Sequence, residues 1–152
     1  MSRAFVKEQD DIGPDAPPEL RVSHHPNLVT PGGLKLIEDR LAELGAALAA
    51  HPDEAAAAWL RRDLRYWSAR HASARVTGRP ADEEEVTFGS RVTFRRSGRT
   101  ETVEIVGEDE ADPAAGRIAW VAPLAAVLIG AIPGETVALA GRELEIVAVE
   151  AL

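Results

Sequence analysis

Residues 30–49 carry apolar side chains in a pattern typical of a coiled-coil helix. Thr30 followed by Pro31 is a typical helix start, because the hydroxyl can accept from free backbone amides and proline has no N–H to leave unpaired. The apolar residues that follow are spaced 3, 4, 3 and 4 apart, and they are Leu34, Ile37, Leu41, Leu44 and Leu48. This spacing places all of them on one face of a helix.

A second helical pattern begins at Pro52, with Asp53 and Glu54 in its first turn, where the helix dipole favours acids. Its apolar face comprises Leu60, Leu64, Trp67, His71 and Ala74. Two such faces can pack together, so residues 30–76 predict an antiparallel helical hairpin, a two-helix coiled coil. With a rise of about 1.5 Å per residue, arms of roughly 20 residues extend ~30 Å.

Charge placement favours the same pairing of the two arms. The first arm carries acids and the second arm arginines, so we expect ion pairs between them. The residues concerned are Glu38, Asp39 and Glu43 on one arm and Arg61, Arg62, Arg65 and Arg70 on the other. His71 lies on the apolar face, and we interpret it as a packed core residue rather than a ligand.

Beyond the polar linker 77–85 the period of the pattern changes to two. Apolar and polar residues alternate on both sides of a Ser-Gly turn signal at 97–98, which predicts a β-hairpin. Further strands are predicted around 118–120, 135–139 and 143–149, and a short apolar helix at 123–130. We therefore expect the α+β fold class: the helical hairpin, then an antiparallel sheet with one helix over residues 86–152.

Residues 1–29 show no apolar period and contain several prolines, which predicts an extended or disordered arm. Phe5 and Val6, together with His24 and His25, could serve as a docking peptide or as half of a metal site. Two adjacent histidines without further ligands bind metal weakly, so we favour a mobile tail.

Composition restricts the partners and the compartment. The 152 residues carry a formal net charge of −8, which argues against sequence-specific or other binding to nucleic acid through phosphate neutralisation. The chain contains no cysteine, so neither a disulfide framework nor a thiolate zinc site is expected. The N-terminus lacks a signal-peptide pattern and no apolar run reaches membrane-spanning length. We expect a cytoplasmic monomer without a membrane partner.

Three sequence blocks carry a resemblance to a known family. They are "VTFGSRVTF" at 86–94, "IVGEDEAD" at 105–112 and "APLAAVLIGAIPGETV" at 122–137, preceded by a helical hairpin that opens with "TPGG". In this order they resemble the bacterial Gre transcription elongation factors. The resemblance implies an FKBP-like C-terminal domain that binds RNA polymerase at the rim of its secondary channel. It also implies a coiled-coil finger whose tip acids hold a magnesium ion in the polymerase active site and promote RNA cleavage.

The acidic stretch from Glu108 to Asp112 admits three interpretations: a solvated loop, a polymerase contact or a metal site. The resemblance places this stretch in the C-terminal domain, away from the finger tip. The sequence offers no apolar neighbour that would raise a carboxyl pKa there, and no adjacent basic residue that would pair with one of the acids. We favour the solvated loop ahead of the other two.

The tip of the hairpin departs from the family pattern. The Gre tip motif, an Asp followed three residues later by a Glu, has no counterpart in "AAHPDEAAAAWL". Asp53 and Glu54 are adjacent and therefore point about 100° apart on a helix. They are candidate tip acids and weak magnesium ligands only in a polymerase complex, but we favour a role as first-turn acids. We expect no intrinsic catalytic residue, no bound cofactor and no enzymatic activity of the chain itself.

The apolar block at 121–130 is the candidate polymerase-binding segment. Its candidate contact residues are Val121, Pro123, Leu124 and Val127, with Pro123 and Leu124 nearer the surface. We expect Leu128, Ile129 and Trp120 in the core.

Three functions remain open on the sequence alone. The first is a Gre-like elongation factor that binds RNA polymerase near its secondary channel. The second is a non-cleaving antagonist or regulator of the nucleoside diphosphate kinase regulator type, which the short finger favours. The third, peptidyl-prolyl isomerisation, rests only on the FKBP-like shape, and fold alone does not establish function.

Overall fold

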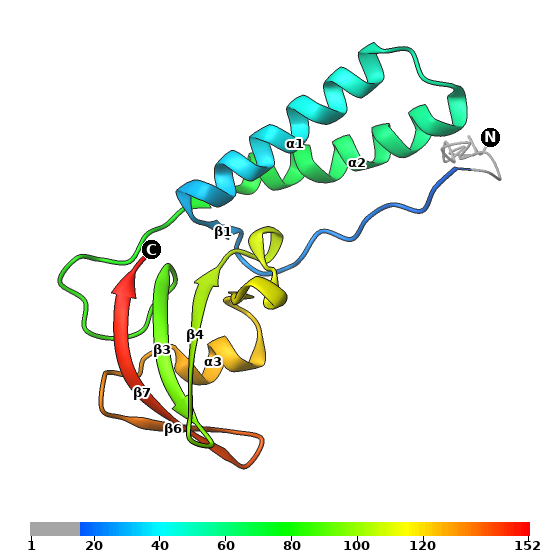
Figure 1. Ribbon diagram of the computed structural model, residues 1–152. Helices are drawn as coiled ribbons and strands as arrows, with labels where there is room; N and C mark the ends of the chain where they lie inside the picture. Colours follow the sequence, from blue (N-terminus) through cyan, green and yellow to red (C-terminus); the bar gives the residue numbers. More distant parts are fainter. Residues whose placement is uncertain (1–15) are drawn as a thin grey trace, which may run out of the picture.

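A computed structural model describes residues 16–152 and shows a long helical hairpin standing on a small domain of sheet and helix (Figure 1). The hairpin consists of α1 (Pro31–Ala49) and α2 (Glu54–Ser73). At 19 and 20 residues, the two helices extend ~28–30 Å. The α+β fold class is confirmed. No helix among residues 16–152 has the length and apolar character needed to cross a membrane.

The two helices pack along the predicted apolar faces. Ile37 of α1 is fully buried and Ala57 of α2 is nearly so. The leucines of the two faces are half-buried. Two helices alone cannot enclose their contact residues, because each helix has only one neighbour. Helix packing in the hairpin is therefore an open seam rather than a closed core.

Two expectations about the hairpin are wrong. His71 is not packed in the seam: its side chain is 47% exposed and lies 3.7 Å from Glu38. The arginines of α2 make no ion pair with the acids of α1 within residues 16–152. Asp39 and Glu43 instead pair with basic residues one turn away on α1 itself. Arg61 and Arg62 pair with acids of α2 itself. Arg65 and Arg70 pair with other segments of the chain.

The C-terminal domain contains one five-stranded sheet in the order β5-β4-β3-β7-β6. Its strands are β3 (Ser90–Arg96), β4 (Arg99–Val106), β5 (Arg117–Ala119), β6 (Thr136–Leu139) and β7 (Arg142–Ala151). The pairs β3–β4, β3–β7 and β6–β7 are antiparallel. β5 pairs with β4 in parallel, so the sheet is mixed and the purely antiparallel prediction is wrong.

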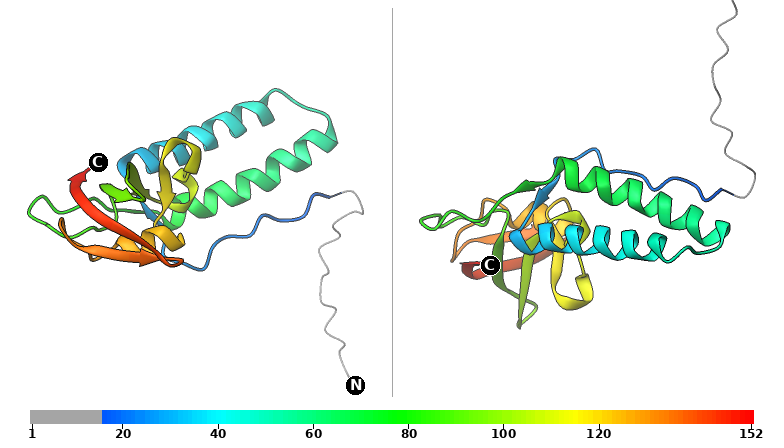
Figure 2. Two further views of the ribbon diagram at one scale, coloured as in Figure 1. Left: turned by 60° about the horizontal axis from the view of Figure 1, so that its bottom comes forward. Right: turned by 90° about the horizontal axis from the view of Figure 1, so that it is seen from above.

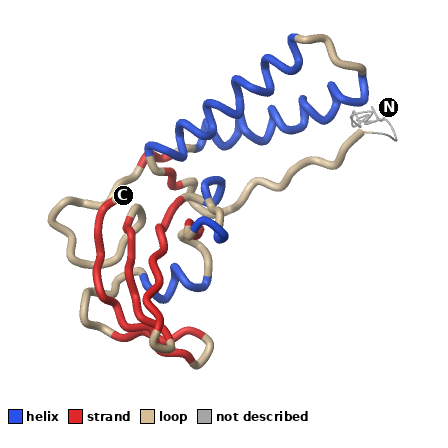
Figure 3. Tube along the Cα trace, viewed as in Figure 1, coloured by secondary structure: helices blue, strands red, loops and turns tan. Residues whose placement is uncertain are grey.

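The short helix α3 (Pro123–Leu128) packs against the curled sheet (Figure 3). Ala125 and Leu128 of α3 join the core formed by inward residues of the strands, including the fully buried Phe94, Ile105 and Leu144. The FKBP-like description of this domain stays a prediction.

A pair of two-residue strands lies at the base of the hairpin. β1 (Leu28–Val29) pairs in parallel with β2 (Arg75–Val76). The predicted arm 1–29 therefore ends in regular structure, although residues 16–27 are extended and run beside the hairpin (Figure 2). Phe5 and Val6 lie outside the described residues.

One buried carboxylate connects the hairpin to the sheet domain. β4 is followed by two short 3-10 helices, η1 (Glu108–Glu110) and η2 (Pro113–Ala115). Glu110 is only 9% exposed, and it accepts from the backbone N–H of Thr30 at 3.1 Å, from that of Gly107 at 3.1 Å and from the Thr30 hydroxyl. The same hydroxyl accepts from the N–H of Gly33 and so caps α1. The start of α1 is thereby bonded to the end of β4.

The contact between Gly33 and Glu110 generates a stability prediction with a matched control. A Cβ at Gly33 would lie 2.3 Å from Glu110 Oε2, whereas a Cβ at Gly32 would meet nothing closer than 3.6 Å. We expect Gly33→Ala to destabilise the protein by ~1–3 kcal/mol because it displaces the buried carboxylate. Gly32→Ala should be neutral or gain up to ~1 kcal/mol through helix propensity. Urea unfolding checks this, and equal stability of the two variants would contradict it.

Candidate functional site

The tip of the hairpin places Asp53 and Glu54 in local structural roles. Asp53 is the N-cap of α2, and its Oδ1 accepts from the backbone N–H of Ala56 at 2.9 Å. Glu54 Oε1 lies 2.8 Å from Arg61 Nη1 of the same helix. Both carboxylates are exposed. The geometry matches that of first-turn acids, and within residues 16–152 no group of three or more metal-ligating side chains comes together.

The candidate polymerase-binding segment divides between surface and core. Pro123 is exposed at the first position of α3. Val121, Leu124 and Val127 are half-buried, and the last two pack against the core cluster. Pro123 is therefore the one member of the predicted set that is exposed.

The core predictions around α3 are right at two positions and wrong at one. Leu128 is fully buried, and Trp120 is half-buried against the core cluster. Ile129 is 39% exposed and lies just beyond the end of α3, as its C-cap residue.

The acidic loop is not solvated along most of its length, and this corrects the interpretation we favoured. Asp109 accepts from the hydroxyl of Tyr66 at 2.5 Å and from Nε of Arg70 at 2.5 Å, and its side chain is 7% exposed. Glu108 lies 3.7 Å from Nη2 of the same arginine. Glu110 is buried at the start of α1. Only Asp112, which lies 3.5 Å from Arg117 with a half-exposed side chain, retains the predicted character.

The loop therefore holds the far end of α2 as well as the start of α1. Arg70 is 1% exposed and would be a costly buried charge without its carboxylate partners. Burial, followed by the hydrogen bond to Asp109, raises the pKa of Tyr66 to about 12. Both helices of the hairpin are thus fixed to η1 by charged side chains shielded from water.

Sequence reasoning missed Tyr66 and assigned Arg70 to the wrong partners, because the true partner of both residues is distant in the chain. Asp109 follows them by 43 and 39 positions. The two residues are one helical turn apart on α2 and therefore lie on the same face. That spacing was the available signal, but it also fits a solvated helix surface.

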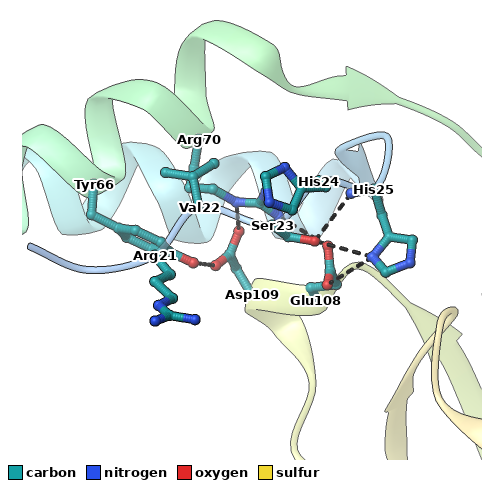
Figure 4. A pocket seen from close by; sticks show the side chains of 9 residues that line it. All are labelled: Arg21, Val22, Ser23, His24, His25, Tyr66, Arg70, Glu108 and Asp109. Carbon is teal, nitrogen blue, oxygen red and sulfur yellow. Dashed lines mark hydrogen bonds and ion pairs between the residues drawn. The ribbon is translucent and has the colours of Figure 1, made fainter.

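An open pocket of about 720 Å³ lies where the extended N-terminal segment passes this junction (Figure 4). Arg21 to His25 line one side, and Tyr66, Arg70, Glu108 and Asp109 line the other. His25 Nδ1 lies 3.9 Å from Glu108 Oε1, and its ring meets Trp120 edge-on at 6.0 Å. The histidine segment, interpreted as a tail, instead contacts η1 and the sheet domain.

Tyr66 provides a direct test of this junction because it is the single tyrosine of the chain. Its folded pKa of about 12 lies above the unfolded value of about 10. The neutral hydroxyl thus contributes stability that is complete below pH ~10 and is lost as the pH rises through the folded pKa. Tyrosinate absorbance of the native protein should titrate near the higher value, and that of the urea-unfolded chain near the lower one. Coinciding midpoints would rule out the buried contact with Asp109.

Comparison of the sequence with known proteins identifies relatives of this chain. A family model described as transcription elongation factor, GreA/GreB, C-terminal, matches residues 81–151. The GreB factor of Neisseria meningitidis serogroup A is 42% identical over 96 residues, which cover 59% of this chain and 59% of that protein. The GreA factor of Acidiphilium cryptum is 36% identical over 113 residues, which cover 59% of this chain and 72% of that protein.

Among solved structures, GreA factor homolog 1 of Thermus thermophilus superposes with a TM-score of 0.41 at 18% identity, over 84% of this chain and 100% of that chain. The chain spans about three fifths of the length of the Neisseria relative. The sequence matches decide the assignment: this chain belongs to the GreA/GreB family of transcription elongation factors.

Proposed function

We propose that the chain binds bacterial RNA polymerase near its secondary channel and modulates elongation. In this proposal the sheet domain grips the polymerase and the hairpin acts as the finger, in the cytoplasm where transcription takes place. Family membership supports the partner. The buried contacts at η1 support separate roles for the hairpin and the sheet domain, because they hold the projecting hairpin at a fixed position on that domain. The chain itself acts without an enzymatic site of its own.

We further propose that the finger does not stimulate transcript cleavage, so that the chain works as an antagonist or regulator. This proposal rests on the contacts of the two tip carboxylates, because both bond to groups of α2 itself. Asp53 caps the helix, and Glu54 pairs with Arg61. Delivering a carboxylate to the magnesium of the polymerase requires placement within about 1 Å, since larger errors can cost ~100-fold in rate. Isolated first-turn acids on a hairpin of ~28–30 Å fit that requirement poorly.

Peptidyl-prolyl isomerisation remains the distant alternative and is tested separately. A peptide isomerase assay on the purified protein distinguishes it, because a polymerase-binding regulator needs no such activity.

The tip generates a prediction that separates cleavage from folding. Asp53→Asn keeps a side-chain acceptor for the cap but removes the charge, and Glu54→Gln removes the second carboxylate. We expect the wild type to stimulate little or no RNA cleavage in backtracked polymerase complexes, and the double variant to behave the same with nearly unchanged polymerase affinity. Transcript length on denaturing gels measures the first quantity, and competition binding the second.

Asp53→Ala serves as the structural control for the tip. It should lower stability by ~1 kcal/mol through loss of the cap, without altering transcript cleavage. Efficient cleavage by the wild type that disappears in the double variant, Asp53→Asn with Glu54→Gln, would make the tip acids catalytic and exclude the antagonist function.

Pro123 generates a prediction about docking. Pro123→Glu places a charge at the exposed first position of α3, where an acid suits the helix dipole and leaves the fold intact. We expect polymerase affinity to fall by about tenfold or more if this residue is a contact anchor. Pro113→Glu is the matched control, because Pro113 is also exposed and also occupies the first position of a short helix, η2.

The docking prediction is checked by polymerase binding together with circular dichroism. Equal affinities of the two proline variants would exclude Pro123 as an anchor. So would a loss of affinity by Pro123→Glu that accompanies a lost native spectrum.

A further inference from the structure

An extended N-terminal segment accompanies the hairpin for much of its length. Residues 16–27, called the strap below, run from β1 beside α2 toward the tip (Figure 1). Glu19 of the strap forms a two-pronged ion pair with Arg65 of α2, with Nε of the arginine 3.2 Å from Oε2 and Nη2 closer to Oε1. The strap thus covers α2 with an acidic side chain at mid-helix.

Buried residues hold the strap at both ends, Asn27 next to β1 and Pro17 near the outer end. At its C-terminal end Asn27 is buried and donates to the carbonyl of Arg70 at 2.7 Å. Toward its other end, within the described chain, no backbone hydrogen bond joins residues 16–25 to α1, α2 or the sheet. The Glu19–Arg65 pair is more than half exposed on both sides, and exposed pairs contribute only ~0.2–1 kcal/mol. Between these two ends the strap is held by side-chain contacts alone, so residues 18–25 can leave α2 without breaking a backbone hydrogen bond to the hairpin.

Near Glu19, α2 presents side chains typical of protein contact surfaces. Trp59 is 50% exposed, and the guanidinium of Arg62 lies 4.5 Å from the centre of its ring. Arg62 also pairs with the neighbouring Asp63, and its side chain is 14% exposed. Arg65 follows one turn later. We call Trp59, Arg62 and Arg65 the α2 arginine face. Tryptophan and arginine are the residue types enriched among the strongest contacts of protein interfaces.

The ligand already present on this face is a carboxylate. The hydrogen bond from Arg65, with smaller contributions from the charges of Arg65 and Arg62, lowers the pKa of Glu19. Both arginines thus favour a carboxylate at this position. A polyphosphate partner is less suited, because nucleic acid binding requires several phosphates to be neutralised at once. Of the two arginines of this face, Arg62 already pairs with Asp63 of α2, and only Arg65 pairs outside the helix. The chemistry favours an acidic protein segment.

We propose that the α2 arginine face is a docking surface for an acidic protein segment, and that the strap occupies this face in the free protein as a competing intramolecular ligand. Release of Glu19 opens the face, and binding of the partner holds the strap away. The proposal does not depend on transcript cleavage or on Pro123. It assigns a role to the N-terminal segment.

Release of the strap is tested by a distance measurement on the full chain. The chain contains no cysteine, so Leu20→Cys on the strap and Ser68→Cys on α2 accept one spin label each, and both residues are exposed. We expect a narrow distance distribution in the otherwise unchanged protein and a broad one after Glu19→Gln. Glu43→Gln, which removes an exposed acid from α1, is the matched control and should leave the distribution narrow. The same distance distribution in all three proteins would contradict the proposal that Glu19 holds the strap on α2.

Docking is tested with a fluorescein-labelled deca-glutamate peptide and fluorescence anisotropy. The Glu19→Gln protein should bind the peptide about two- to fivefold more tightly than the wild type, which corresponds to the loss of one exposed ion pair. Adding Arg65→Gln should abolish that gain, and Glu43→Gln should bind as the wild type does. Near 1 M salt, where charges are screened within ~3 Å, the difference should vanish.

Two outcomes of the binding experiment would overturn the docking surface. One is equal affinity of the wild type and the Glu19→Gln protein for the peptide. The other is tighter binding of a labelled deca-uridylate than of deca-glutamate to the Glu19→Gln protein, since that result would replace the acidic protein segment by RNA.

Discussion

The buried carboxylate of Glu110 is the contact on which the arrangement of the molecule depends. It accepts from Thr30 of the hairpin and from Gly107 at the end of β4. A carboxylate that is 9% exposed is stable only when its oxygens are bonded. The close approach of α1 that satisfies them leaves no room for a side chain at Gly33. Gly33 in the first turn of α1 therefore reflects a packing requirement.

The neighbouring Asp109 adds the second helix to the same loop. Because Arg70 is almost fully buried, removing its carboxylate would leave an uncompensated charge at a cost of ~3–5 kcal/mol. One short 3-10 helix thus holds both arms of the hairpin through three consecutive acids, Glu108 to Glu110. A finger-like hairpin is useful only if its base is fixed, and these contacts fix it from the sheet domain.

The spacing of apolar residues and the turn residues predicted those parts of the fold that depend on contacts between residues close in the sequence. The heptad spacing of Leu34 to Leu48 identified α1, and the Ser97-Gly98 turn identified the β3–β4 hairpin. The parallel pairing of β5, the burial of Asp109 and the ion pair of Arg65 with Glu19 all depend on segments far apart in the sequence. A cluster of acids has the same appearance in a sequence whether water or a distant arginine surrounds it. The candidate site was therefore less predictable than the fold.

The distribution of arginine partners connects the fold to the proposed function. Had Arg62, Arg65 and Arg70 paired with α1, as the charge pattern favoured, α2 would have no basic side free for another segment. Instead Arg70 is committed to the junction, while Arg65 pairs with the N-terminal strap. Arg62 pairs with Asp63 of α2 itself and stacks on Trp59. The hairpin is thus stabilised by its apolar seam and its base rather than by arginine–carboxylate pairs between its arms. Its outer side can exchange partners without a change in the fold, which a regulator that docks reversibly requires.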